Sequence, residues 1–151
     1  PGNYINLSSA YSGKKEFERS LEYLKRGEEI DPKFPYIYSA RGGIYSQMKE
    51  YQKAIDNYSK AIEIKKLSDF YRGRCSAYYE LGKFEEAVAD CSEAINLNPK
   101  GAWNFYYRGL ARQKLEQNAL AISDFRKTLE LQPNLLGAKQ QLDNLLKENK
   151  Y

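Results

Sequence analysis

The chain has 151 residues, of which 42% are hydrophobic and 29% are charged, with a formal net charge of +4. This balance excludes a disordered chain, and no apolar run approaches the ~18 residues that a membrane helix needs. The 24 Lys and Arg residues are spread among 20 acids, whereas a nucleic-acid-binding face would be a clustered basic patch. We therefore expect a folded domain with no nucleic-acid binding and no direct membrane insertion.

The first segment, residues 1–34, contains two short amphipathic patterns. Apolar or small residues recur at i, i+3, i+4 and i+7, the spacing of one face of an α-helix. Pro32 ends the second pattern, because proline cannot continue the hydrogen-bond ladder of a helix. We expect helices at about 2–14 and 17–30. The residues that carry the patterns are Tyr4, Leu7, Ser8, Tyr11, Phe17, Ser20 and Leu24.

The second segment, residues 35–67, repeats the first and predicts helices at 35–48 and 51–65. It has no terminal proline, so we expect Ser68 or Asp69 to cap the following helix. The residues on its pattern are Tyr38, Gly42, Tyr45, Met48, Tyr51, Ala54, Tyr58 and Ala61.

The third segment, residues 68–101, is the most regular and predicts helices at 68–81 and 84–97. Gly82 supplies the turn between them, and Pro99 ends the unit. The residues on its pattern are Tyr71, Arg74, Cys75, Tyr78, Leu81, Phe84, Ala87, Val88, Cys91, Ala94 and Ile95.

The last two patterns complete the chain. Residues 102–135 predict helices at 102–115 and 118–131, although Glu116-Gln117-Asn118 replaces the Gly-x-aromatic turn of the third segment. A single amphipathic stripe then predicts one helix near 134–148 with a polar outer face, as a terminal capping helix requires. The stripe consists of Ala138, Leu142, Leu145 and Leu146.

The recurring unit resembles the tetratricopeptide repeat (TPR), a 34-residue helix–turn–helix with the skeleton W-x2-L-G-x2-Y…A-x3-F…P. In residues 68–101 the two early aromatics, the alanine, the later aromatic and the proline of that skeleton are Tyr71, Tyr78, Ala87, Cys91 and Pro99. The resemblance implies an all-α fold, an α-solenoid of four helix–turn–helix hairpins in a right-handed superhelix with a C-terminal capping helix.

The same resemblance defines the domain organisation. It implies a single TPR domain over 1–151, with repeats 1–34, 35–67, 68–101 and 102–135 and a capping helix at 136–151. Because the chain opens with Pro1-Gly2 inside the first repeat, we expect it to be a fragment of a longer protein.

Three repeats carry arginine at position 7, where the skeleton has leucine. Position 23 is acidic or an amide in the same repeats, whereas the first repeat combines Leu7 with Tyr23. This pattern favours a polar contact between the two helices of one hairpin, because a half-buried guanidinium needs such partners. The alternative is that the arginines bind an acidic ligand. The pairs are Arg41 with Asn57, Arg74 with Asp90, and Arg108 with Asp124.

The two cysteines, Cys75 and Cys91, occupy positions where the helices of one hairpin face each other. We interpret them as two small buried side chains with free thiols, the usual behaviour of free cysteine. A disulfide or redox pair is the alternative. The free thiols and the absence of a signal peptide predict a cytoplasmic location.

The chain contains no histidine, which excludes a His-based general base, a Ser–His or Cys–His pair, and metal sites of the His/Cys type. The phosphate-binding patterns GxxxxGK[ST] and GxGxxG are also absent. We expect no enzyme activity and no cofactor.

The resemblance implies that the first helix of each repeat lines a concave groove. Small residues, such as Ser9, Ala40 and Gly43, line its N-terminal half and leave room for a ligand, whereas aromatic residues line its C-terminal half. Trp103, the only tryptophan, is expected to contact a ligand in this half. The alternative is that it packs on the turn beside Pro99. The candidate ligand-binding residues are Tyr36, Asp69, Arg72, Ser76, Tyr79, Trp103, Tyr106, Tyr107, Gln113 and Lys114.

TPR co-chaperones bind a terminal carboxylate with five Lys, Asn and Arg residues at fixed positions of three successive repeats. Counted from the first repeat, these positions hold Ile5, Ser9, Ala40, Asp69 and Gly73. Counted from the second repeat, they hold Ser39, Gly43, Gly73, Trp103 and Tyr107. Neither set can bind a carboxylate in that way, so we expect a chain outside the carboxylate-clamp subtype.

The sequence therefore predicts a protein–protein interaction scaffold that binds a peptide or a partner helix in its groove. The partner is expected to be another protein. The alternative function is a self-assembling structural module, because the first helix could expose Tyr4, Leu7 and Tyr11 along an open edge.

Overall fold

The computed structural model describes residues 1–148, which form nine α-helices and no strand. Every helix boundary lies within two residues of its predicted position, and the all-α class is confirmed. Residues 149–151 of the expected capping helix lie outside the described part. Within that part, no helix is long and apolar enough to cross a membrane. The helices are α1 (Gly2–Gly13), α2 (Phe17–Ile30), α3 (Pro35–Gln47), α4 (Tyr51–Ile64), α5 (Ser68–Glu80), α6 (Phe84–Leu97), α7 (Ala102–Lys114), α8 (Asn118–Leu131) and α9 (Leu136–Glu148).

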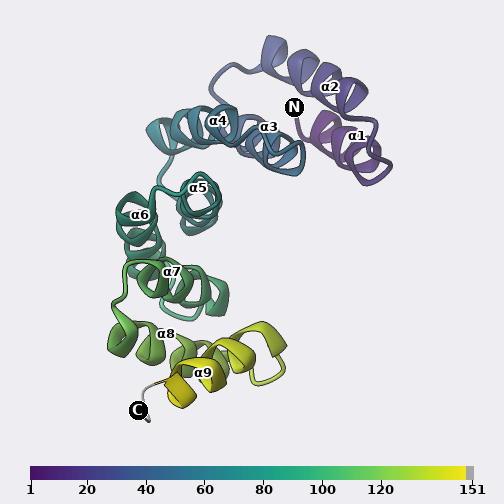
Figure 1. Cartoon of the computed structure of the whole chain (residues 1–151). Coiled ribbons are helices and arrows are strands. Elements are labelled where there is room, and N and C mark those ends of the chain that lie inside the picture. The colour runs from purple at the N-terminus through teal and green to yellow at the C-terminus, as the bar shows by residue number, and fades with distance from the viewer. Residues whose placement is uncertain (149–151) are drawn as a thin grey trace.

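The helices pack as four hairpins followed by a single helix, and the hairpins follow one another along an arc (Figure 1). The first helices of the hairpins lie toward the inside of the arc, and the second helices form its outer side. Each hairpin turn contains one residue with positive φ, namely Lys15, Lys49, Gly82 and Glu116. Only the glycine adopts this conformation without a steric cost from a Cβ atom. The turn at Glu116 therefore has the same backbone form as the others, although its sequence departs from theirs.

Each hairpin is closed by a contact between one residue of its first helix and one of its second. A Cβ atom added at Gly42 would lie 3.0 Å from the ring of Tyr58, and one added at Gly109 would lie 2.8 Å from the ring of Phe125. Both rings are buried. Glycine is therefore required at these positions because the aromatic ring of the second helix occupies the space that a side chain would need.

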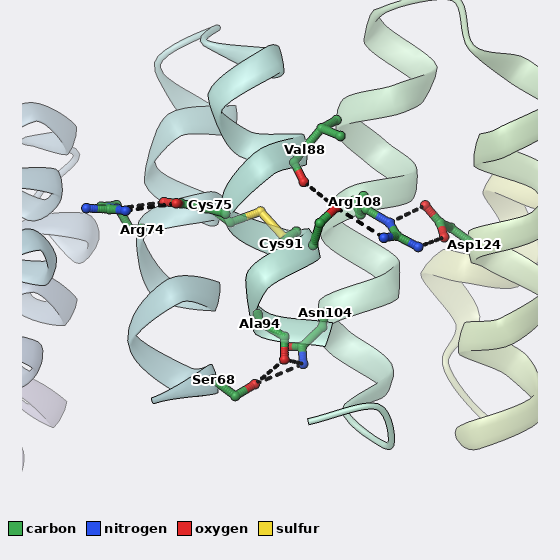
Figure 2. The surroundings of a disulfide bond; sticks show 11 residues. Ser68, Arg74, Cys75, Val88, Cys91, Ala94, Asn104, Arg108 and Asp124 are labelled. Atoms are coloured by element: carbon green, nitrogen blue, oxygen red, sulfur yellow. Dashed lines mark hydrogen bonds and ion pairs between the residues drawn. A yellow bond between two sulfur atoms is a disulfide. The ribbon is translucent and has the colours of Figure 1, made fainter. Parts of the chain in front are cut away.

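In the third hairpin, the equivalent contact is a disulfide between Cys75 and Cys91 (Figure 2). Their Cα atoms lie 5.5 Å apart, and both side chains are completely buried. The interpretation of two free thiols is therefore wrong, although the prediction that these positions face each other is confirmed. The cytoplasmic location stays a prediction, and it loses the support that free thiols would have given.

The predicted ion pairs are confirmed in the third and fourth hairpins. Arg74 donates to Asp90 through Nε at 2.6 Å and Nη2 at 2.8 Å. Arg108 donates in the same way to Asp124, at 3.0 and 2.8 Å (Figure 2). Each pair joins the first helix of a hairpin to its second helix, α5 to α6 and α7 to α8, as the structural interpretation predicts.

Arg41 departs from this pattern. Its Nη2 donates to Glu28 of α2 at 2.5 Å, whereas Asn57, the expected partner, donates to the backbone carbonyl of Lys53. The prediction of an Arg41–Asn57 contact is therefore wrong. A charged carboxylate within reach makes a stronger, charge-assisted hydrogen bond than a neutral amide can.

A buried polar contact joins the third hairpin to the fourth. Asn104 of α7 is 2% exposed, and its Nδ2 donates to Ser68 Oγ and to the Ala94 carbonyl, both at 3.1 Å (Figure 2). Ser68 in turn donates to the same carbonyl at 2.8 Å. The prediction that Ser68 or Asp69 caps α5 is wrong, because α5 begins after Leu67 without a side-chain cap and the Ser68 hydroxyl is used between helices.

Reduction of the disulfide is expected to lower the free energy of unfolding. The two cysteines are 16 residues apart, and closing a loop of about this size contributes ~3 kcal/mol through the reduced entropy of the unfolded chain. The measurement is urea unfolding, followed by circular dichroism, with and without a phosphine reductant. A Cys75→Ala/Cys91→Ala variant is the control, because its unfolding midpoint should not respond to the reductant. Two titratable thiols in the unfolded, unreduced chain would contradict the disulfide.

Candidate functional site

The ten candidate ligand-binding residues lie on α3, α5 and α7, three of the helices on the inside of the arc (Figure 1). The structure brings six of them together in two groups. One is an aromatic group on α7, and the other lies where α3 meets the beginning of α5. Their members are Trp103, Tyr106 and Tyr107 in the first group, and Tyr36, Asp69 and Arg72 in the second.

The aromatic group is a set of rings in mutual contact. The ring centroid of Trp103 lies 5.5 Å from that of Tyr106 and 6.1 Å from that of Tyr107, and the two tyrosines are 5.7 Å apart. Trp103 remains 42% exposed. The indole is therefore an accessible apolar surface held in place by two neighbours, which fits an anchor for a ligand better than a residue buried in a turn.

Two aromatic residues that were predicted to bind a ligand, Tyr79 and Tyr106, also pack against residues of the protein itself. The ring centroid of Tyr106 lies 6.1 Å from that of Phe125. A Cβ atom added at Gly137 of α9 would lie only 2.8 Å from the Tyr106 hydroxyl. Tyr79 packs on Phe84 at 5.7 Å. Burial raises the pKa of both phenols. Trp103 and Tyr107 therefore offer more of their surface to a ligand than these two tyrosines do.

The second group surrounds a pocket between α3 and α5. Tyr36 is 41% exposed, and its ring contacts Phe34 at 5.4 Å and Phe70 at 5.6 Å. Tyr36 and Asp69 both line the pocket, which has a volume of about 450 Å³. Its other lining residues come from α3, the turn between α4 and α5, the beginning of α5 and the end of α6, namely Ser39, Lys66, Leu67, Ser68, Phe70, Leu97 and Asn98.

The charges of this group largely cancel. Arg72 Nη2 lies 3.0 Å from Asp69 Oδ1, in an ion pair that is open to solvent. Arg72, one of the candidate ligand-binding residues, therefore has a charged partner on its own helix. Of the remaining candidates, Ser76 and Gln113 are half-buried and Lys114 is exposed.

Sequence reasoning missed Tyr58, which belongs to the outer helix α4. Its ring passes between Gly42 of α3 and Gly73 of α5, where a Cβ atom added at Gly73 would lie 2.5 Å from Tyr58 Cε1. The space that Gly73 leaves is therefore filled by the protein itself. The signal in the sequence was a glycine on each of two successive first helices, with an aromatic residue on the second helix between them.

Farther toward the N-terminus, the expected hollow lined by small residues is present. It has a volume of about 280 Å³ between α1 and α3. Ser12 donates a hydrogen bond to Gln47 at 3.2 Å across this junction. Its lining residues are Ser8, Ser9, Ser12, Gly13, Ala40, Gly43, Ile44 and Gln47.

Comparison with known families identifies the repeated unit. Models described as "Tetratricopeptide repeat" match residues 1–34 and 35–66, and a model described as "TPR repeat" matches residues 76–116. Together these segments cover most of the chain.

Among curated proteins, human RNA polymerase II-associated protein 3 is 31% identical over 150 residues, which cover 93% of this chain and 22% of that protein. Heat shock protein STI1 of Saccharomyces cerevisiae is 32% identical over 110 residues, 72% of this chain and 19% of that protein. The chain thus spans about a fifth of the length of these relatives.

Two solved structures show the same architecture. The first TPR of Spaghetti (RPAP3) bound to HSP90 peptide SRMEEVD has a TM-score of 0.76 and 30% identity, covering 78% of this chain and 94% of that chain. The crystal structure of MamA has a TM-score of 0.86 at 20% identity, covering 95% of this chain and 84% of that chain. The similarity to MamA, at 20% identity, supports the fold alone.

Substitution of the two inner glycines should affect stability in opposite directions. Gly73→Ala forces the Tyr58 ring to move and should lower the free energy of unfolding by ~1–3 kcal/mol. Gly43→Ala is the matched control, because its Cβ atom would lie 3.7 Å from the Tyr58 hydroxyl, an ordinary contact. Alanine is also the better helix former there by ~0.5–1 kcal/mol. Equal shifts of the two urea midpoints would contradict this packing.

Proposed function

The chain belongs to the tetratricopeptide repeat family, and we propose that it is a scaffold that binds a segment of another protein in the groove of α3, α5 and α7. The observation that carries the proposal is the exposed aromatic group around Trp103. Trp and Tyr side chains with accessible faces are the residue types that anchor interfaces. Neither catalysis nor a cofactor is part of the proposal.

Relatives support a peptide as the ligand. The first TPR of Spaghetti (RPAP3) is bound to HSP90 peptide SRMEEVD, and the second TPR domain of human RPAP3, 29% identical, is in complex with HSP70 peptide SGPTIEEVD. For this chain we propose a peptide segment of a partner protein, and the SRMEEVD peptide is a defined first probe.

We also propose that recognition here does not use the five-residue carboxylate clamp. Two of the cationic clamp positions, counted from the first repeat, hold Asp69 and Gly73. Asp69 is already paired with Arg72, and the space beside Gly73 is occupied by Tyr58. A terminal carboxylate would therefore meet a carboxylate and a phenol ring where the clamp places cations.

The absence of a clamp can be tested directly. The SRMEEVD peptide is synthesised as the free acid and as the C-terminal amide, and the binding of each is followed by fluorescence anisotropy. The two forms should bind this chain with the same affinity, because no pair of free cations receives the carboxylate. The first TPR of RPAP3 serves as a positive control for probe binding. Binding of the acid to this chain, with roughly tenfold weaker binding of the amide, would overturn the proposal.

Self-association through the first repeat is the second candidate function. Position 10 is buried in the later inner helices, at Ile44, Ala77 and Ala111, but Ala10 of α1 is exposed. Leu7 beside it is also exposed, although Tyr11 is half-buried against Tyr23. A sedimentation series over increasing concentration separates the two functions, because a monomer at every concentration excludes self-assembly.

Removal of the aromatic anchor should weaken peptide binding. A ligand is first selected from a phage-displayed library of random dodecapeptides and then synthesised. Trp103→Ala and Tyr107→Ala should each weaken its binding by roughly tenfold or more, because truncation of a central aromatic anchor costs ~2 kcal/mol. The intrinsic fluorescence of Trp103, the only tryptophan, reports binding to the tyrosine variant.

The control is Leu120→Ala, which removes an exposed apolar side chain from the outer helix α8. This variant should bind the peptide as the unchanged chain does. Equal losses in Leu120→Ala and Trp103→Ala would mean that the ligand does not use the inner surface. A chain that selects no peptide at all would overturn the scaffold function.

A further inference from the structure

The pocket between α3 and α5 lies at an irregular junction between two hairpins. Four-residue turns join α2 to α3, α6 to α7 and α8 to α9, at residues 31–34, 98–101 and 132–135. Each of these turns contains a proline and is closed by a backbone hydrogen bond of 3.2 Å from its fourth residue to its first. The turn between α4 and α5 has only three residues, 65–67, without a proline or such a bond. Two of these three residues line the pocket, so the hollow lies where the repeat is one residue short.

Apolar side chains from three helices form the walls of this pocket. The ring centroid of Tyr36 on α3 lies 5.6 Å from that of Phe70 on α5, so the buried Phe70 supports the exposed tyrosine ring. Leu97, the last residue of α6, is 47% exposed. All three residues line the pocket, and its volume of about 450 Å³ falls within the ~300–1,000 Å³ of ligand pockets in proteins. Exposed apolar side chains gathered around a hollow are typical of an interaction site.

The charge at the rim of the pocket comes from Lys66. The charged residues that line the pocket are Lys66 and Asp69. Asp69 is paired with Arg72 of its own helix. Lys66 is exposed, and none of the ion pairs among residues 1–148 involves it. The unpaired charge therefore favours an acidic group in a ligand that enters the pocket.

We propose that this pocket receives an aromatic side chain of the bound peptide, and that Lys66 pairs with an acidic residue beside that side chain. The proposal rests on the scaffold function proposed above and names the class of its ligand, a peptide segment with neighbouring aromatic and acidic residues. An aromatic ring suits the pocket better than an aliphatic side chain, because contact with the Tyr36 ring is favourable beyond the burial of apolar area. The pocket gives the ligand an anchor in addition to the aromatic group on α7.

The first test removes one wall of the pocket. Leu97→Ala should weaken the binding of the library-selected peptide by roughly fourfold or more, the effect of at least one buried methylene group. Ile64→Ala is the matched control, because Ile64 ends α4 as Leu97 ends α6 and is 40% exposed, but does not line the pocket. This control should bind as the unchanged chain does. Circular dichroism checks that both variants remain folded.

The second test reverses the charge at the rim. Lys66→Glu should weaken the binding of the same peptide by roughly fivefold, because an attraction is replaced by a repulsion. A second peptide, with lysine in place of the acidic residue, should recover the lost affinity for this variant. Lys65→Glu is the matched control, because it makes the same change at an exposed neighbour that does not line the pocket. It should show no such recovery.

The third test locates the aromatic residue on the peptide. Each aromatic residue of the peptide is replaced in turn by alanine. One replacement should weaken binding to the unchanged chain by a larger factor than binding to Leu97→Ala, since part of the contact is already missing in that variant. Binding is followed by the fluorescence of Trp103 in both proteins.

The outcomes separate this inference from the scaffold function. A peptide whose binding is weakened by Trp103→Ala, but unchanged by Leu97→Ala or by Lys66→Glu, overturns the inference and leaves the scaffold function standing. The inference also fails if the selected peptide lacks an aromatic or an acidic residue. It fails as well if sedimentation shows that Leu97→Ala abolishes self-association, which would assign the pocket to a second copy of the chain. A chain that selects no peptide overturns both the inference and the scaffold function.

Discussion

The structure depends on one contact in each hairpin, where a residue of the first helix meets a residue of the second. Gly42 and Gly109 lack side chains, so the rings of Tyr58 and Phe125 can lie directly against the backbone of the first helix. The third hairpin meets the same requirement with the disulfide between Cys75 and Cys91. Because each hairpin rests on the previous one, these contacts fix the surface that the next hairpin packs on, and so the path of the arc.

The same contact shapes the groove. Tyr58 packs against Gly42 of its own hairpin and also against Gly73 of the next one, so that a residue of an outer helix fills the space beside two inner helices. This requires glycine on two successive inner helices. In the fourth hairpin, the equivalent Phe125 is fully buried and has no hydroxyl. The packing beside the middle inner helices therefore differs from the packing in the fourth hairpin, although the repeats share one backbone plan.

Local signals made the helices predictable, because periodicity and turn residues act within one segment of sequence. The ion pairs of Arg74 and Arg108 were predictable as well, since arginine and aspartate occur together in two repeats. The disulfide was not, because the repeat frame predicts that Cys75 and Cys91 meet but says nothing about their oxidation. Tyr58 was missed because the frame assigns the space beside Gly73 to a ligand, and only the packed structure shows that a side chain from α4 fills it.

The distribution of charge decides what kind of ligand suits the groove. Arg74 and Arg108 are paired with Asp90 and Asp124 of the outer helices, and Arg72 is paired with Asp69 at the groove itself. The inner helix α7 adds the aromatic area around Trp103 and the exposed side chain of Lys114. A ligand that pairs with these arginines would have to compete with bonds that the protein already makes, and paired charges add little net affinity. The aromatic area faces no such competition, so we propose apolar side chains as the ligand groups that suit this part of the groove.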